Sequence, residues 1–239
     1  MRKQYQTSWH DIKFKTFIKT STSNIAGPKF YDSFYEEFYK NYQSFDDISR
    51  EYVKRKKCVI EFLENKIISK KSVLSIGCGI GLIEKILLER HNFNNNFIAI
   101  EPSAISVKWI SQYPGIKIYN GYFPEVLTDK NIDFDFAYAR AIDYVFNRKE
   151  YIDFLRSIIA YGITEFTVIS VCIDKRSFDI LFKDLLKIIL SKFNLYDLGQ
   201  FWGYLRTEED HKESFHCAGF RNLSVEYLDH STVAISGRI

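Results

Sequence analysis

Short apolar runs alternate with amphipathic stretches along the chain from residue 72 onward. Five of the runs have the length and the Val, Ile and Phe content of strands buried on both faces, at residues 72–76, 97–101, 116–120, 134–139 and 164–171. Amphipathic segments long enough for crossover helices lie between them, at residues 82–91, 103–113 and 148–160. This alternation predicts a doubly wound α/β sheet whose strands are mostly parallel.

The C-terminal part of the chain follows a different pattern. A long helix is expected over about residues 175–195 and a short one over 207–219, and two apolar runs follow at 220–228 and 231–239. Only two residues separate these runs, and such close spacing predicts an antiparallel hairpin. We therefore expect a Rossmann-like, mostly parallel seven-stranded sheet with this hairpin at its C-terminal edge.

Aromatic residues at helical spacing distinguish the N-terminal part. Residues 30–45 place Phe30, Phe34, Phe38 and Tyr42 four positions apart, which predicts a helix with a broad aromatic face. A second helix is expected over about residues 46–66. Because a segment of about 55 residues cannot bury a core alone, we predict an N-terminal helical cap or lid at residues 1–55 and a main domain at residues 56–239. Most of the rings are expected to pack between them.

Composition and charge narrow the class of protein. The 239 residues are 46% hydrophobic, which excludes a disordered chain, and the net charge of +3 is too small to indicate a polyanionic partner. The first residues lack the apolar core of a signal peptide, and no apolar run is long enough to span a membrane. The four cysteines form no C-x-x-C pair and no metal-ligand spacing, so we expect a cytoplasmic protein without a metal site.

The sharpest motif is VLSIGCGIG at residues 73–81, in which Gly77, Gly79 and Gly81 follow a strand and open a helix. Alternate glycines let the chain turn tightly and bring its backbone against a ligand. Glu101 ends the next strand, where a carboxylate can accept hydrogen bonds from both hydroxyls of a ribose. Strand, loop, helix, strand and terminal acid in this order predict a site for a ribose-bearing ligand.

With this G-x-G-x-G spacing, residues 56–239 resemble the class I S-adenosylmethionine-dependent methyltransferases that act on small molecules. The resemblance implies that S-adenosylmethionine is the cofactor. The residues it assigns to the cofactor are the loop residues Gly77, Cys78, Gly79 and Gly81, the ribose-binding Glu101 with Pro102, then Gly121, Tyr122 and Phe123 at the adenine, and Arg140, Ala141 and Ile142 on the methyl-transfer face. Many members have Asp where this chain has Ser75, at a position that supports the cofactor's amino end, so the charge is either lost or supplied from elsewhere.

Methyl transfer from a sulfonium is an in-line displacement, so the protein mainly positions the acceptor and excludes water. A hydroxyl acceptor benefits from a base near its proton. Asp143 and Tyr144 follow the fourth strand at the carboxyl edge of the sheet, and Asp143 is the candidate base, although a helix cap or a partner for Arg140 explains it equally well. Among the histidines, His10 in the N-terminal cap is retained as a catalytic candidate.

The resemblance also implies that the acceptor pocket is shaped by the N-terminal helices and by the connection before the last hairpin. Tyr31 is expected at the cofactor's carboxylate or at the acceptor, and Tyr35 at the acceptor. Residues 199–207 are expected to form a loop that gathers three acceptor-binding side chains, Trp202, Tyr204 and Arg206. The alternative is a packed loop with a surface arginine.

These features predict an enzyme that methylates a small molecule, with a hydroxyl of a sugar, a glycan precursor or a secondary metabolite as the acceptor. An RNA or protein methyltransferase, or a non-catalytic subunit that keeps the fold, are the alternatives. The basic run at residues 54–57 is interpreted as the solvated face of a helix, so nucleic acid is not expected as a partner. A homodimer is left open.

Overall fold

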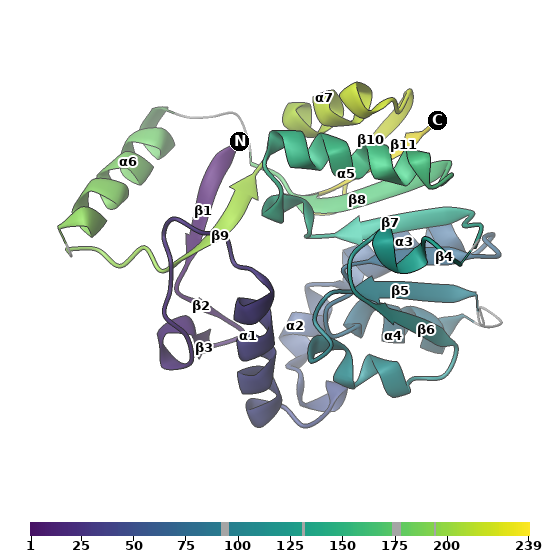
Figure 1. Ribbon diagram of the computed structural model, residues 1–239, viewed down its shortest axis with the longest axis horizontal. Helices are drawn as coiled ribbons and strands as arrows, with labels where there is room; N and C mark the ends of the chain where they lie inside the picture. Colours follow the sequence, from purple (N-terminus) through teal and green to yellow (C-terminus); the bar gives the residue numbers. More distant parts are fainter. Residues whose placement is uncertain (92–95, 131, 174–177, 194) are drawn as a thin grey trace.

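A seven-stranded sheet in the order β10-β11-β8-β7-β4-β5-β6 forms the centre of the protein (Figure 1). The computed structural model describes residues 1–91, 96–130, 132–173, 178–193 and 195–239. The strands of the sheet are β4 (Val73–Ile76), β5 (Phe97–Glu101), β6 (Ile116–Asn120), β7 (Phe136–Arg140), β8 (Glu165–Val171), β10 (Asn222–Tyr227) and β11 (Thr232–Arg238). Strands β4 to β8 pair in parallel, whereas β11 is antiparallel to both β8 and β10. The predicted Rossmann-like sheet with an antiparallel edge hairpin is confirmed.

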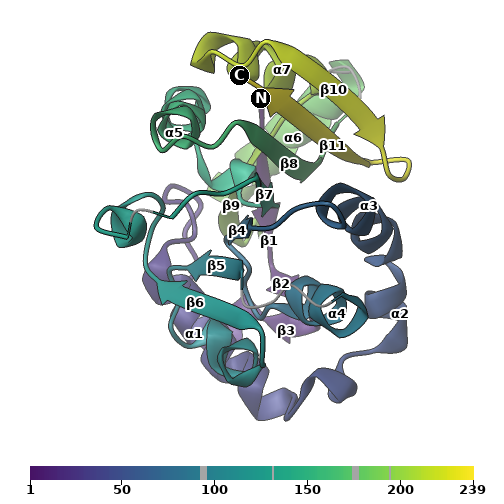
Figure 2. The same cartoon turned by 90° about the vertical axis from the view of Figure 1, so that its right-hand side faces the viewer.

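Helices cover both faces of this sheet, which is why its central strands are continuous apolar runs. The covering helices are α3 (Lys57–Ile67), α4 (Leu82–Arg90), α5 (Arg148–Ala160) and α7 (Glu208–Ala218). Figure 2 shows α5 on the opposite side of the sheet from α3 and α4. Strand β7 alternates accordingly, because Phe136 and Tyr138 pack with α3 and α4 while Ala137 and Ala139 pack with α5.

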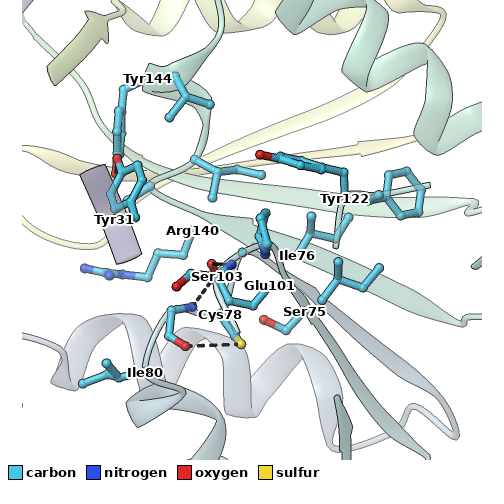
Figure 3. A pocket seen from close by; sticks show the side chains of 18 of the residues that line it. Tyr31, Ser75, Ile76, Cys78, Ile80, Glu101, Ser103, Tyr122, Arg140 and Tyr144 are labelled. Carbon is cyan, nitrogen blue, oxygen red and sulfur yellow. Dashed lines mark hydrogen bonds between the residues drawn. The ribbon is translucent and has the colours of Figure 1, made fainter. Parts of the chain in front are cut away.

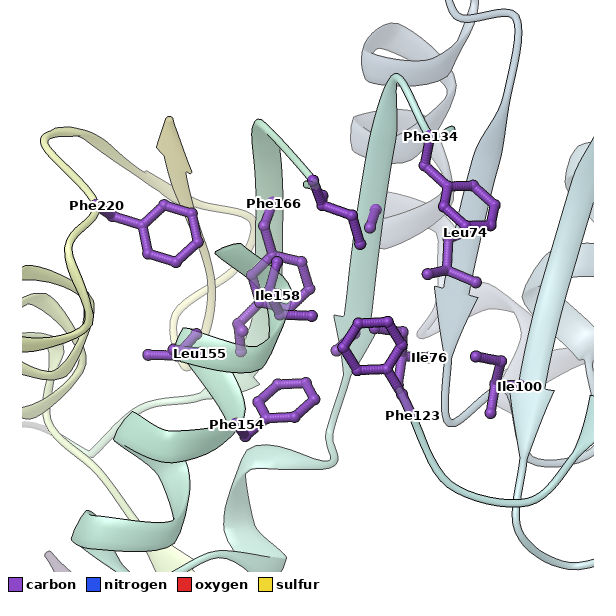
Figure 4. Packing of buried hydrophobic residues seen from close by; sticks show 14 of the residues in the cluster. Leu74, Ile76, Ile100, Phe123, Phe134, Phe154, Leu155, Ile158, Phe166 and Phe220 are labelled. Atoms are coloured by element: carbon purple, nitrogen blue, oxygen red, sulfur yellow. The ribbon is translucent and has the colours of Figure 1, made fainter. Parts of the chain in front are cut away.

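Small residues on β7 leave room for large apolar side chains above them. Leu155 and Ile158 of α5 are fully buried beside Phe166 of β8 (Figure 4). The same cluster continues to Phe123 and Ile76, which lie next to the loop after β4. The core thus reaches the carboxyl ends of the central strands and supports the loops there.

The strand order reverses beside β4. The chain passes from β4 to β5 and β6 on one side, and then crosses to β7 and β8 on the other. At such a point the loops after the two neighbouring strands diverge and leave a crevice at their carboxyl ends. The glycine loop follows β4 and Arg140 ends β7, so both predicted ligand segments reach this crevice.

Some predicted helices differ from those observed. The expected helix over residues 46–66 is divided into η2 (Phe45–Asp47), α2 (Arg50–Lys54) and α3, because Ser44 and Ser49 each cap a new start. Between β5 and β6 the chain forms two 3-10 helices, η3 (Ser106–Lys108) and η4 (Ile110–Gln112), rather than one α-helix.

The side chains of Ser103 and Ser106 explain the irregular segment between β5 and β6. Ser103 Oγ accepts from the Ser106 amide, and Ser106 Oγ donates to the Ser103 carbonyl, so these groups compete with helical hydrogen bonds. A further 3-10 helix, η5 (Glu125–Leu127), follows β6. The long predicted helix is α6 (Phe178–Lys192), and its expected start at residue 175 lies outside the described residues.

The N-terminal region contains strands as well as helices. Its elements are β1 (Arg2–Gln6), β2 (Ser8–Trp9), β3 (Ile12–Lys13), η1 (Phe14–Thr16) and α1 (Pro28–Asn41). Strand β1 pairs antiparallel with β9 (Gln200–Leu205). The prediction of a loop at residues 199–207 was therefore wrong. This pairing joins the first residues of the chain to a segment far away in the sequence, so no local pattern could reveal it.

The aromatic stripe of α1 packs, as predicted for most of its rings. Phe30, Phe34 and Phe38 are all buried. Trp202 of β9 completes their cluster, since its ring is stacked on that of Phe14 with centroids 5.4 Å apart and planes 11° from parallel. The cluster holds α1, β9 and the N-terminal hairpin together over the carboxyl edge of the sheet.

Candidate functional site

A cavity of about 740 Å³ lies at the carboxyl ends of β4, β5 and β7, beneath α1. It is lined by the glycine loop, by the ends of β5 and β7, and by residues of the N-terminal region. Of the residues proposed from the sequence, those that line it are His10, Tyr31, Tyr35, Ser75, Gly77, Cys78, Gly79, Glu101, Pro102, Gly121, Tyr122, Phe123, Arg140, Ala141, Ile142 and Tyr144. The structure therefore brings most of the predicted cofactor residues together in one place.

The glycine loop requires glycine at its first and last positions. Gly77 has φ +75°, and a Cβ there would lie 2.4 Å from Ile142 Cγ2. Gly81 also has φ +75°, and its Cβ would meet Ile110 at 2.4 Å. Side chains at these positions would push the loop away from Ile142 and Ile110, against which it packs. Gly81 packs against Ile110 and does not line the cavity, whereas Gly79 lines it.

Glu101 connects the second strand to this loop. Its carboxylate accepts a hydrogen bond from the Gly79 amide at 2.9 Å and one from the Ser103 amide at 3.0 Å (Figure 3). Burial raises the pKa of Glu101, and the two amide donors oppose that shift. Since a carboxylate has about four lone-pair sites, Glu101 can still accept hydrogen bonds from hydroxyls of a ligand in the cavity.

A second buried carboxylate, which was not predicted from the sequence, lines the cavity beside Ser75. Glu84 of α4 accepts hydrogen bonds from Ser75 Oγ at 2.7 Å and from Tyr138 Oη at 2.8 Å. Burial raises the pKa of Glu84 while both hydroxyl donors lower it. The available signal was an acid among the apolar residues of LIEKILL, which a solvent-facing position does not explain.

Basic side chains line another part of the same cavity. Arg140 Nε is buried and makes no hydrogen bond to any residue that the structure describes. Lys56 lies with its Nζ 4.6 Å from the ring centroid of Tyr52, and burial together with Arg140 and Arg55 lowers its pKa to about 7. The basic run at residues 54–57 is thus only partly a solvated face, because Lys56 points inward.

His10 reaches the cavity through the tight turn between β2 and β3. His10 and Asp11 have φ values of 48° and 61°, as in the turns that join two-residue hairpins. The His10 ring packs on Tyr52 with centroids 4.5 Å apart. Burial, and then the charge of Lys56, lower the pKa of His10 to about 4, so the imidazole is neutral at pH 7.

Tyrosine hydroxyls meet above Arg140. The Oη atoms of Tyr31 and Tyr144 are 3.3 Å apart, and Figure 3 shows both rings on one side of the cavity and Tyr122 on the other. Burial raises the pKa of Tyr144 to about 12, so its hydroxyl stays protonated. Trp202 does not line the cavity but stacks on Tyr144 with centroids 6.0 Å apart.

The candidate base Asp143 lies behind the cavity wall. Its Oδ2 is 3.5 Å from Arg206 Nη1 and 3.7 Å from His211 Nε2, and all three side chains are buried. Arg206 also donates to the carbonyls of Asp143 and Phe146, each at 2.6 Å. Neither Asp143 nor Arg206 is among the residues that line the cavity. Asp143 is paired with Arg206 and His211, whereas the alternatives expected a helix cap or a pair with Arg140. Arg206 is buried and not on the surface, as the packed-loop alternative had expected it to be.

Strand β9 supports the cavity wall from behind. Gly203 has φ +150°, and a Cβ there would lie 2.2 Å from the carbonyl oxygen of Tyr144 in η6 (Asp143–Val145). Tyr204 packs its ring on Phe201 with centroids 5.3 Å apart and lies outside the lining. Of the three residues expected to bind the acceptor from this segment, Trp202 stacks on Tyr144, and Arg206 donates to the carbonyls on either side of Tyr144 and Val145, whereas Tyr204 packs on Phe201.

Two further properties concern the part of the chain that the structure describes. Within it, no three His, Cys, Asp or Glu side chains come together as a metal site. No helix there combines the length and the apolar content of a membrane span.

No family model matches the sequence, and no curated protein matches it either. Solved structures share its fold. Human N-acetylserotonin methyltransferase in complex with SAM is 14% identical with a TM-score of 0.59, and the match covers 89% of this chain and 56% of that one. A candidate O-methyltransferase from Nostoc punctiforme is 18% identical with a TM-score of 0.62, over 92% of this chain and 64% of that one. The DhpI–SAH complex is 12% identical with a TM-score of 0.57, over 89% of this chain and 95% of that one.

The present chain spans less than two thirds of the length of the first two of these proteins. These matches show that the chain has the fold of the class I S-adenosylmethionine-dependent methyltransferases.

Proposed function

We propose that the protein transfers a methyl group from S-adenosylmethionine to a hydroxyl of a small molecule. One observation carries the proposal: the Gly79 amide and the Glu101 carboxylate are hydrogen-bonded at the wall of a cavity that lies at the switch point of the sheet. The backbone of the glycine loop and the acid proposed to bind the ribose therefore line the same cavity. Structural neighbours named as SAM and SAH complexes support the choice of cofactor.

The residues present fit the two ends of this cofactor. Glu101 accepts from the ribose hydroxyls, while Tyr122 and Phe123, with Pro102, enclose the adenine. The amino-acid end lies between opposite charges: the Glu84 carboxylate binds the ammonium group, and Arg140 binds the carboxylate with its unpartnered buried Nε. Glu84 thereby replaces the acid that Ser75 lacks.

The acceptor occupies the remaining space beneath the N-terminal region. A volume of about 740 Å³ lies in the upper part of the range for small-molecule pockets and suits a cofactor together with a small acceptor. The lining there is aromatic, from Trp9, Tyr31, Phe38 and Tyr144. Rings of this kind pack on the faces of a sugar, a glycan precursor or a secondary metabolite.

The chemistry asked of the protein is modest. Bound S-adenosylmethionine supplies an already activated methyl group. The neutral His10 accepts the proton of the acceptor hydroxyl, and the paired hydroxyls of Tyr31 and Tyr144 orient the acceptor. The aromatic cluster closes the cavity against water.

Calorimetric titration with S-adenosylhomocysteine tests the cofactor site. The wild-type protein should bind, and Glu101→Ala should weaken binding by at least about tenfold, because it removes a charged acceptor. The matched control is Glu226→Ala, an exposed acid on β10 that lies outside the cavity. Absence of binding by the wild type, or equal affinities for Glu101→Ala and the wild type, would remove the cofactor assignment.

Transfer from radiolabelled S-adenosylmethionine tests the acceptor class. Hydroxyl-bearing sugars and phenols should be labelled, and the label should be recovered as a methyl ether. Binding of the cofactor with labelling of RNA or protein alone would replace the small-molecule acceptor by one of these macromolecules.

A further inference from the structure

Helix α6 presents large apolar side chains to the outside of the molecule. Figure 1 shows it at the margin, beside β1 and β9 and apart from the seven-stranded sheet. We call five of its residues the α6 apolar face, namely Phe182, Leu185, Leu186, Ile189 and Phe193 just past its end, and their exposed fractions run from 42% to 70%. An amphipathic helix normally buries such a face.

The polar side of α6 makes the contact with the rest of the chain. Arg2 of β1 donates to Asp184 through two hydrogen bonds, from Nε at 2.5 Å and from Nη2 at 2.9 Å. With 3.6 residues per turn, Asp184 lies on the opposite side of the helix from Phe182 and Ile189. The helix is therefore held by a bidentate ion pair on its polar side, and this orientation leaves the α6 apolar face outward.

The spacing of this face is that of a helix–helix seam. Phe182, Leu186, Ile189 and Phe193 follow one another at intervals of four, three and four residues, which is the a/d repeat of a coiled coil. The repeat covers residues 182–193. A seam of this kind is complementary to another copy of itself.

The exposed area is also of the size that a dimer needs. From their exposed fractions, the five side chains of the α6 apolar face offer roughly 550 Å² of apolar surface. That lies at the upper end of the range of about 300–600 Å² for the largest apolar patch on a typical monomer. Two such surfaces together approach the total area of about 1,200–2,000 Å² that stable interfaces bury.

Charge favours a protein partner over a lipid surface. Over α6, three lysines stand against two aspartates, Asp179 and Asp184. The excess of one positive charge gives little attraction to anionic lipid, which is bound by clusters of about four to eight basic residues. We propose that a second copy of this chain covers the α6 apolar face, with the two α6 helices paired across a two-fold axis.

Sedimentation velocity from about 1 to about 100 µM tests the proposal. The wild-type protein should dimerise. Ile189→Glu, at the centre of the seam, should raise the dimer dissociation constant by at least about tenfold because it buries an unpaired charge. The control Lys187→Glu changes charge on the polar side of the same helix and should leave the dimer intact.

Two measurements show that Ile189→Glu acts at the surface. Its far-ultraviolet circular dichroism and its affinity for S-adenosylhomocysteine should equal those of the wild type, because none of the α6 side chains that the structure describes lines the cavity. Leu186→Ala, which keeps helix propensity, should weaken the dimer in the same direction.

Three outcomes would overturn the proposal. One is a wild-type protein that stays monomeric over the whole concentration range. Another is a dimer that Ile189→Glu leaves unchanged. The third is flotation of a monomeric wild type with phosphatidylglycerol vesicles, abolished by Ile189→Glu, which would assign the α6 apolar face to a lipid surface instead.

Discussion

Ser75 donates a hydrogen bond of 2.7 Å to Glu84, and this contact places a buried carboxylate in the cavity wall beside a residue that carries no charge itself. The acid comes from α4 rather than from the end of β4. The acid that is absent at the strand position is therefore present on the helix that follows the strand.

Glu84→Gln should weaken the binding of S-adenosylhomocysteine by about tenfold or more, because an amide replaces the charged partner of the ligand's ammonium group. Methylthioadenosine lacks the amino-acid end, so its affinity should be nearly unchanged. Titration calorimetry with both ligands measures the difference. Equal losses for the two ligands would mean that Glu84 supports the loop and does not bind the ammonium group.

Lys56 should make cofactor binding depend on pH. Its pKa of about 7 means that it is charged below this value and neutral above it, so it adds to carboxylate binding by Arg140 only at lower pH. The groups facing it are His10, Arg55, Cys58, Arg140 and Asp229, together with the ring of Tyr52.

The dissociation constant for S-adenosylhomocysteine should accordingly rise severalfold as the pH increases from about 6 to about 8.5. Lys56→Met should bind more weakly at pH 6 and lose that part of the dependence, whereas the ligand's own titration is common to both proteins. Parallel pH profiles for wild type and Lys56→Met would contradict the assignment.

Asp143→Asn should leave methyl transfer within a few-fold of the wild type, because Asp143 faces Arg206 and His211 behind the cavity. A general base would instead account for about 10²–10⁴ in rate. His10→Phe, which keeps a ring in the tight turn, should cause the larger loss in kcat. The ratio of kcat values for the two variants decides between them.

Arg206→Met should lower the free energy of unfolding by about 3–5 kcal/mol, since it leaves the Asp143 carboxylate buried without its cationic partner. Urea denaturation measures this change. Arg148→Met is the matched control, because Arg148 pairs with Glu213 at the surface, where an ion pair contributes at most about 1 kcal/mol. Equal effects of the two substitutions would argue against the buried pair.

Gly203→Ala should displace Tyr144, because a Cβ at this position would overlap the Tyr144 carbonyl. The expected cost is about 1–3 kcal/mol in stability. The KM for the acceptor should rise while the affinity for S-adenosylhomocysteine changes little, since Tyr144 is proposed to orient the acceptor. A loss confined to cofactor affinity would place Tyr144 elsewhere in the reaction.

Local sequence patterns predicted the sheet well because its central strands are short continuous apolar runs buried on both faces. The same holds for the loop from Gly77 to Gly81, whose positive φ angles only glycine adopts readily. Glu101 could be placed beside Gly79 because parallel neighbouring strands end at the same edge of a sheet.

The helix over residues 46–66 was predicted less well, since serine caps and short-range hydrogen bonds compete with apolar periodicity. Lys56 within it was assigned to the solvent because a basic run normally lies there. Its burial depends on which side of α3 faces the cavity, and that follows from packing on the sheet rather than from the run itself.

The sequence by itself determined the seven strands of the main sheet, the glycine loop and the acid after the second strand. These features depend on backbone conformation and on burial periods of a few residues. Only the tertiary structure decided that β1 pairs with β9, that the Glu84 carboxylate lies beside Ser75, and that Asp143 packs against Arg206 behind the cavity. The physical reason is that each of these contacts joins separate elements, so its geometry is set by how they pack and not by the pattern within either one.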